Sequence, residues 1–418
     1  MTFGNPLRLE SFAPFRHRDF ALFWSGAFVS NIGTWMETVA FGYYVTARTG
    51  QAVWPGLVAA ATFVPTAFLG PVGGALADRM PRKAILLTTT AVQTMFAGLI
   101  TTLMVIGHPA PIVVVLVAFG SGCAAAMGFP AYQAMIPDMV PIEDLPGAIA
   151  LGSAQWNLGR VIGPLLAGIA ITVGGIPWAL GANTVSFFAV IVVLLLITLP
   201  RPAAGARDSK ILAAIRSGFR LVRADPGLRV VIQTMSLNTL LAAPFIALLP
   251  YMAIKVFHSG KGGTSVLVTA QGIGAVSAAL AMGPLGMRHG VRWIMVRSVG
   301  LVPFALLLYA IAPNLPFSAA AIVVVGALYL ASLSSFTTIA QQRAPAEFRG
   351  RVLSVNNVVL GTVYPVGAAF EGLLADHFGL RAVTAGSAIV MLVVLAAVRT
   401  LRPGYTKAVD TPYAPVTV

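Results

Sequence analysis

Three ionisable residues lie inside long apolar stretches of this sequence: Glu37, Arg160 and Glu371. A charged or titratable group is costly to bury in a membrane, so such residues usually indicate function. A carboxyl group at Glu37 could bind a proton on one side of a membrane and release it on the other. Arg160 keeps its charge at physiological pH and needs a carboxylate, carbonyl oxygens or an anionic ligand. We therefore expect Arg160 to influence the protonation of Glu37.

Each of these residues also has a structural interpretation. Glu37 could make a fixed polar contact at the outer mouth of a bundle, Arg160 could tie helices together through carbonyls, and Glu371 could pair with another helix. Aromatic and polar residues near them could line a cavity, because small-molecule sites combine apolar walls with a few polar groups. The further candidates for that cavity are Trp35, Tyr132, Gln133, Gln155 and Asn157.

The composition points to a membrane protein without a cofactor. Of the 418 residues, 57% are hydrophobic and 10% are charged, whereas soluble chains carry roughly 25% charged residues. The net charge is +14, and the basic residues lie in short loops between apolar runs. This distribution indicates the topology of a membrane protein, so we expect no nucleic-acid partner. The single cysteine excludes an intrachain disulfide and a multi-cysteine metal site. Five dispersed histidines, no evident pair of nucleophile and base, and no phosphate-binding loop for ATP argue against an enzyme.

Twelve apolar runs are long enough to cross a bilayer, which takes about 20 residues per helix. Basic residues gather in alternate loops, and cytoplasmic loops retain positive charge. The sequence therefore predicts an all-α, multi-pass protein of twelve transmembrane helices with both termini in the cytoplasm. The predicted spans are 20–46, 54–77, 84–106, 111–136, 146–173, 177–199, 228–256, 263–287, 293–313, 316–340, 352–375 and 380–401.

The longest polar interruption divides the spans six and six. We predict an N-terminal half at 1–199, a cytoplasmic linker with a basic amphipathic helix at 200–227, a C-terminal half at 228–401 and a cytoplasmic tail at 402–418. The linker helix either lies against anionic headgroups or is solvated. The halves look like degenerate copies, a plan typical of secondary transporters that bind substrate near the midplane.

The end of the second run and the short loop after it combine a glycine in the helix with a carboxylate and cations in the loop: Gly74, Asp78, Arg79, Arg82 and Lys83. Glycine lets a neighbouring helix approach closely in lipid. The carboxylate and the cations can pair across the short turn and hold two helices in one of two arrangements. This is the chemistry of a conformational latch.

The pattern Gly74-x-x-x-Asp78-Arg79-x-x-Arg82-Lys83 resembles the signature of the major facilitator superfamily, although Pro81 stands where glycine is usual. The resemblance implies a fold of two six-helix pseudo-repeats. It also implies that Asp78 and Arg82 stabilise an outward-facing state by docking the second helix against the eleventh. Pro81 should stiffen the turn without abolishing this latch.

The fifth run contains Gly159, Gly163, Pro164 and Gly168 with a spacing that resembles the antiporter signature of drug and proton exchangers in this superfamily. The glycines allow close helix packing, and the proline removes a backbone hydrogen bond and bends the helix. The alternative is a packing kink that has no bearing on the direction of transport.

Four further segments resemble the enterobactin-exporter and macrolide-efflux branch: Phe15–Phe20, Asn31–Met36, Phe129–Gln133 and Phe348–Leu353. The resemblance implies a monomer in a bacterial inner (plasma) membrane that exports bulky amphiphilic molecules, drug-like or siderophore-like, by proton antiport and alternating access. Two alternatives stay open. One is a proton-coupled uptake symporter for an organic anion, with Arg160 as its clamp, and the other is a lipid or lysolipid flippase of the same fold. A membrane-embedded enzyme or scaffold finds no support in these residues.

Overall fold

The computed structural model describes residues 10–198, 211–345 and 348–410, and they are almost entirely helical. Within these residues, eleven helices are long and apolar enough to cross a membrane. The first helix, α1 (Arg18–Thr49), has 32 residues but is not among the eleven, since polar residues such as Asn31 and Glu37 make it less apolar. The all-helical membrane fold is thus confirmed, with eleven of the twelve predicted spans meeting both requirements.

The chain forms two compact units, and the first contains the described residues up to Ala40 and from Leu69 through the sixth long helix. Within it, α3 packs against both α4 and α6. Gly175 separates α5 from α6 at a φ of +81°, a left-handed conformation that glycine adopts without steric cost. Its elements are η1 (Glu10–Arg16), the first part of α1, the last part of α2 (Val53–Arg79), α3 (Arg82–Ile106), α4 (Pro111–Met135), η2 (Ile136–Asp138), α5 (Leu145–Gly174) and α6 (Ile176–Leu196).

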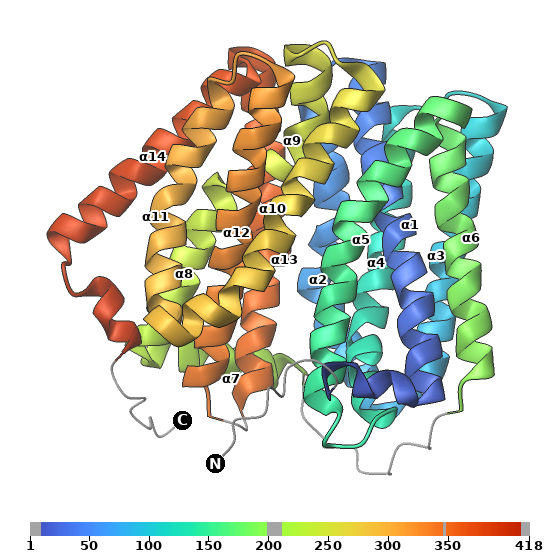
Figure 1. Ribbon diagram of the computed structural model, residues 1–418, viewed down its shortest axis with the longest axis horizontal. Helices are drawn as coiled ribbons and strands as arrows, with labels where there is room; N and C mark the ends of the chain where they lie inside the picture. The colour runs from blue at the N-terminus through green and yellow to red at the C-terminus, as the bar shows by residue number, and fades with distance from the viewer. Residues whose placement is uncertain (1–9, 199–210, 346–347, 411–418) are drawn as a thin grey trace. The chain divides into compact units, whose positions relative to one another are not determined.

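The second unit contains Phe41–Phe68 and the described residues from α7 onward. Inside this unit, α12 packs against α10 and α11, and α11 packs against α14 (Figure 1). Its elements after the start of α2 are α7 (Ile211–Ala224), α8 (Pro226–Leu241), α9 (Phe245–Tyr251), η3 (Met252–Val256), α10 (Gly260–His289), α11 (Val291–Ala310), α12 (Leu315–Arg343), α13 (Arg349–Phe378), α14 (Leu380–Leu401) and η5 (Tyr405–Val409).

The amphipathic helix expected in the linker is α7. In its described side chains, Arg220 and Arg223 are exposed while Leu221 and Val222 are buried, and the helix packs against α13. Residues 200–210 of the predicted linker and residues 411–418 of the predicted tail lie outside the described part of the chain.

The compact units do not follow the predicted boundary at residue 199, because the end of α1 and the start of α2 group with the second unit. Asp376 of α13 explains part of this grouping: its carboxylate accepts hydrogen bonds from the backbone N–H groups of Ala52 and Val53, the latter at 3.0 Å. A Cβ at Gly56 would lie 2.5 Å from the carbonyl oxygen of Ala368, so the glycine permits a close approach of α2 to α13.

Candidate functional site

Glu37 faces α6, where its carboxylate meets a polar side chain. The Nδ2 atom of Asn183 donates a 2.7 Å hydrogen bond to Glu37 Oε2. The Ser186 hydroxyl lies 3.2 Å from Asn183 Oδ1 and donates to the Asn183 backbone oxygen at 2.7 Å. Because Oδ1 faces the Ser186 hydroxyl, the amide group is oriented with its N–H bonds toward Glu37. The partner of Glu37 in this structure is thus Asn183, not the predicted Arg160.

Gly33 makes this contact between α1 and α6 possible. It lies one helical turn before Glu37, and a Cβ at this position would collide with Ser186 Oγ and lie 2.6 Å from Asn183 Oδ1. Any larger residue would separate the two helices, so glycine brings the Glu37 carboxylate within reach of Asn183. The sequence singled out Glu37 but not Asn183 or Ser186. Their only signal was that they interrupt an otherwise apolar sixth run.

An apolar pocket of about 500 Å³ lies beside this polar group and includes Gly33 and Ser186 in its wall. Three helices of the first unit form it: α1, α5 and α6. Its apolar side chains include Val29, Ile32, Met36, Leu166, Ile169 and Trp178. The pocket places an apolar volume against the residues that orient Asn183, so an occupant with an apolar body and a polar group could contact both.

A second polar cluster lies between α1 and α5. The guanidinium of the buried Arg160 is 5.2 Å from the centroid of the Trp35 ring, a cation–π arrangement. Trp35 also meets the exposed Trp156 edge to face, with ring centroids 6.2 Å apart. Among the described residues, the buried Nε1 of Trp35 has no hydrogen-bond partner. The cluster therefore combines a cation, two aromatic surfaces and one available N–H donor.

The glycine spacing of the fifth run packs α5 against α1. A Cβ at Gly163 would lie 2.5 Å from Trp35 Cβ and 2.8 Å from the Ile32 carbonyl oxygen, and one at Gly159 would lie 3.0 Å from Asn31 Cβ. Pro164 lies inside the helix, as expected for a bend, and Gly168 follows one turn later. These contacts fix the position of Trp35, whereas a bend at Pro164 and its role in antiport stay predictions.

Gln155 and Tyr132 form a tie between helices. Gln155 is fully buried; it accepts a 3.0 Å hydrogen bond from the Tyr132 hydroxyl and donates to the Trp24 carbonyl oxygen at 3.3 Å. The Tyr132 ring also stacks on Phe23 with centroids 5.0 Å apart. These contacts join α1, α4 and α5, so both residues are satisfied within the helix bundle.

The remaining candidate residues are Gln133, Asn157 and Glu371. Gln133 is exposed, and the side chain of Asn157 lies outside those the structure describes. Glu371 belongs to the second unit, where it is buried and accepts a 2.6 Å hydrogen bond from the Ser387 hydroxyl. This bond joins α13 to α14 and supports the interpretation of Glu371 as a polar contact to another helix.

Two cations of the predicted latch, Arg82 and Lys83, bind helix ends within the first unit. Arg82, at the start of α3, donates to the Asp138 carboxylate at 2.6 Å and to the Ala134 carbonyl oxygen at 2.8 Å. Lys83 donates to the carbonyl oxygen of Ile197 at 2.8 Å, where a cation interacts favourably with the C-terminal end of α6. Both side chains therefore stabilise the ends of neighbouring helices.

Asp78 and Gly74 present an open face of α2. The side chains of Asp78 and Arg79 are exposed, and a Cβ at Gly74 would meet no atom of the described residues within 4 Å. Gly73, by contrast, is packed against Met127. The face that carries Gly74 is thus free to accept a helix, as the latch interpretation requires.

Known membrane transporters are similar to this chain in fold and in sequence. The fold matches a solved bacterial homologue of the human lysosomal transporter Spinster with a TM-score of 0.74, over 97% of this chain and 100% of that one at 15% identity. The sequence is 23% identical over 373 residues to macrolide efflux protein A of Streptococcus pyogenes, covering 87% of this chain and 90% of the relative. An enterobactin exporter of Salmonella choleraesuis is 29% identical over 307 residues, 72% of each chain. These features define a multi-pass membrane transporter of the major facilitator superfamily.

The chain belongs to the family of transmembrane secretion effectors, which it matches over residues 9–414. Its bacterial relatives include a macrolide efflux protein, a multidrug efflux pump, an enterobactin exporter and a staphyloferrin A transporter. The predicted superfamily and branch are therefore confirmed, as is the class of transporter in place of enzyme. The orientation of the termini stays a prediction.

Proposed function

We propose that this protein exports bulky amphiphilic small molecules in exchange for protons. The observation that carries the proposal is the hydrogen bond between Asn183 and Glu37 beside the apolar pocket of α1, α5 and α6. The relatives support the substrate class, since their names include macrolide efflux and enterobactin export.

Glu37 is the proposed proton-binding residue. A carboxylate removed from water needs hydrogen-bond donors to remain charged, and Asn183 supplies one. Protonation removes the charge and converts one carboxyl oxygen into a donor, which weakens the hold of Asn183 on it. The bond thus distinguishes the two protonation states of Glu37.

Substrate and proton would be coupled through Asn183. Ser186 lines the apolar pocket and faces the Asn183 amide oxygen, so an occupant that presses Ser186 toward Asn183 strengthens the hydrogen bond to the charged Glu37 carboxylate and favours release of its proton. A substrate that weakens proton binding is weakened by the proton to the same extent, because coupling free energies are reciprocal. This reciprocity is the physical basis of the proposed exchange.

The cluster of Arg160, Trp35 and Trp156 would contact the polar part of the substrate. Trp35 Nε1 is a buried donor that a substrate oxygen could use, and the exposed Trp156 ring offers an apolar surface. Asn157, Gln133 and Glu371 remain candidates for the transport path. This arrangement favours a large amphiphilic molecule, with an apolar body and a few carbonyl or hydroxyl groups, over a sugar or an inorganic ion.

Transport would proceed by alternating access, with each half moving largely as a rigid body. The open face of α2 at Gly74 and Asp78 would dock against the eleventh span in the outward-facing state. Arg82 and Lys83, which bind the ends of α4 and α6, would keep the first unit intact during that movement. We further propose a monomer in the bacterial inner membrane with both termini in the cytoplasm.

One alternative has a specific observation in its favour. The pocket of α1, α5 and α6 is lined almost entirely by apolar side chains and could accept a lipid tail. A flippase of this kind would move a lysophospholipid whatever the pH on either side. An uptake symporter for an organic anion, with Arg160 as its clamp, would instead move substrate and protons in the same direction.

Transport into everted membrane vesicles that contain the protein distinguishes an antiporter from a symporter and from a flippase. Their lumen corresponds to the outside of the cell, so the proposed antiporter accumulates a macrolide when the lumen is acidic, and Glu37→Gln abolishes that accumulation. Glu143→Gln is the matched control, since Glu143 is an exposed loop carboxylate. Accumulation driven by an acidic bath would indicate symport. Movement of a fluorescent lysophospholipid without any pH gradient would indicate a flippase, and either result would contradict the proposal.

A further inference from the structure

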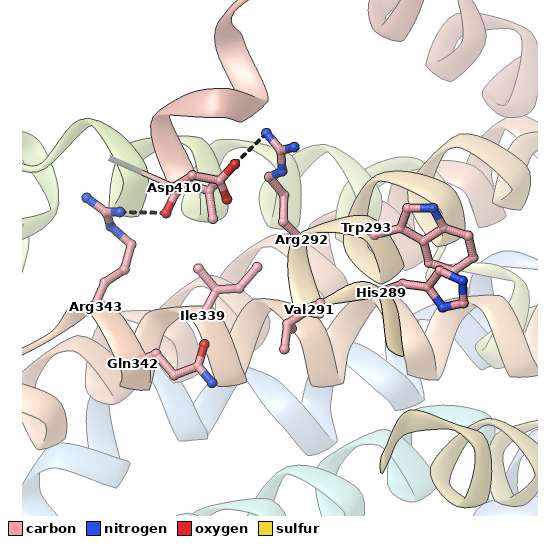
Figure 2. Close-up of a pocket in the computed structure, with 10 residues that line it drawn as sticks. His289, Val291, Arg292, Trp293, Ile339, Gln342, Arg343 and Asp410 are labelled. Atoms are coloured by element: carbon pink, nitrogen blue, oxygen red, sulfur yellow. Dashed lines mark hydrogen bonds and ion pairs between the residues drawn. The ribbon is translucent and has the colours of Figure 1, made fainter. Parts of the chain in front are cut away.

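A pocket of about 560 Å³ with several polar residues in its wall lies in the second unit, and its wall contains none of the candidate site residues. It is formed by the end of α10, the start of α11, the end of α12 and the short η5 segment (Figure 2). The basic loop residues predict that this end of the unit faces the cytoplasm. The residues that give the pocket its chemistry are His289, Arg292, Trp293, Gln342, Arg343 and Asp410.

The two arginines of the pocket differ in how they are satisfied. Arg343 is 8% exposed and makes a two-pronged ion pair with Asp225 at 2.7 and 2.9 Å, and it also donates to the Val409 carbonyl oxygen at 2.6 Å. Arg292 is 36% exposed and pairs at 2.8 Å with Asp410, which is 57% exposed. An exposed ion pair is weak, so another anion can replace the Asp410 carboxylate on Arg292.

An apolar stripe on α11 begins at this pocket. It consists of exposed side chains three to five residues apart along the helix: Trp293, Val296, Leu301, Phe304 and Leu308. At this spacing the residues lie on one face of a helix. Because α11 is one of the candidate membrane spans, this face is suited to contact with lipid tails.

Arg297 links the stripe to the pocket. It is exposed on α11 one turn beyond Trp293, and its guanidinium lies 5.4 Å from the centroid of the Trp293 ring. The ring of Trp293 also stacks on His289, with ring centroids 4.5 Å apart (Figure 2). A second cation is therefore held over the ring of Trp293, at the end of the apolar stripe that adjoins the pocket.

We propose that this pocket binds the headgroup phosphate of an anionic phospholipid. Arg292 would contact the phosphate, Arg297 would add a second charge, and the acyl chains would follow the stripe on α11. In the absence of lipid, the Asp410 carboxylate pairs with Arg292. The lipid phosphate displaces this carboxylate when it binds. Basic pockets between membrane helices on the cytoplasmic side bind such headgroups. The inference does not depend on the proposed transport activity.

The test is a titration of phosphatidylglycerol into the full-length protein in detergent, with the melting temperature as the readout. We expect phosphatidylglycerol to raise the melting temperature and phosphatidylcholine with the same acyl chains to leave it unchanged. Arg292→Gln and Arg297→Gln should each raise the half-saturating lipid concentration about five-fold. Asp410→Asn should lower it, since the competing carboxylate is gone.

Arg288→Gln is the matched control, because Arg288 is an exposed arginine at the same helix end that does not line the pocket. Equal losses in Arg288→Gln and Arg292→Gln would overturn the proposal in favour of general surface charge. If glycerol 1-phosphate raised the melting temperature over the same concentration range as the lipid, the site would bind a free organic phosphate, and the proposal would fail. If Arg292→Gln does not fold, unchanged lipid binding in Asp410→Asn overturns the proposal by itself.

Discussion

The side-chain amide of Asn183 donates a 2.7 Å hydrogen bond to the carboxylate of Glu37, across the contact between α6 and α1. Gly33 allows this contact, because any side chain at that position would push α6 away. The bond connects a titratable group in the first unit to Asn183, whose amide oxygen faces Ser186 in the wall of an apolar pocket.

Replacing Asn183 tests whether this bond matters for coupling. Asn183→Leu removes the donor to Glu37 while keeping a side chain of similar size. We expect macrolide accumulation in everted vesicles with an acidic lumen to fall by about five-fold or more. Thr184→Val is the control, since it removes a hydroxyl one residue further along α6 that bonds to Thr101 instead. Unchanged accumulation in Asn183→Leu would contradict a role for this hydrogen bond.

The contact between α5 and α1 predicts a clear stability effect. In Gly163→Ala, the new methyl group would lie 2.5 Å from Trp35 Cβ, and such overpacking costs about 1–3 kcal/mol. We expect a lower melting temperature in detergent. Gly300→Ala is the matched helical control, because no atom lies within 4 Å of its Cβ position and alanine favours the helix. A Gly163→Ala protein as stable as its parent would show that α1 and α5 are not packed this closely.

The sequence was sufficient to predict the transmembrane spans, because a run of about 20 apolar residues has few alternatives to a membrane helix. It also predicted that Gly159 and Gly163 permit a close helix approach, which the structure bears out against α1. It did not reveal which helix they approach. Spacing along one helix defines a face, but the neighbour of that face depends on the packing of the whole bundle.

The same limit explains the partners of Glu37 and Arg160. Both residues stand out as ionisable groups in apolar runs, and an ion pair between them was a reasonable expectation. In the structure, Glu37 bonds to α6 while Arg160 lies over Trp35, two residues before Glu37 on α1. Positions two apart point to different faces of a helix, and nothing in the sequence said that α6 borders the face of Glu37. Long-range pairs such as Asp225 with Arg343 were missed for this reason too.

The buried ion pair of Asp225 and Arg343 should be important for the stability of the second unit. Asp225→Asn retains an oxygen that can accept from Leu228 N, the capping bond at the start of α8, but leaves the Arg343 charge without its buried counterion. Breaking a buried pair in this way costs about 3–5 kcal/mol. Asp410→Asn, at an exposed pair, should cost less than about 1 kcal/mol. Unfolding measurements on both variants check the contrast, and equal stabilities would contradict it.

The exposed carboxylate of Asp78 should affect transport without affecting stability. Asp78→Asn removes a charge that faces solvent here, so we expect an unchanged melting temperature. If Asp78 helps dock α2 in the other conformation, the initial rate of macrolide transport should fall. A rate equal to that of the parent protein would show that this residue is no part of a latch. Glu143→Gln serves again as the control for loss of one exposed negative charge.

Proton release on substrate binding is the most direct test of the central claim that Glu37 exchanges its proton for substrate. The purified protein in weakly buffered detergent solution receives a saturating macrolide, and the pH change is recorded for the parent, Glu37→Gln and Glu371→Gln. The account predicts release from the parent and from Glu371→Gln, and none from Glu37→Gln. Equal release from Glu37→Gln, or substrate binding without any release from the parent, would contradict it.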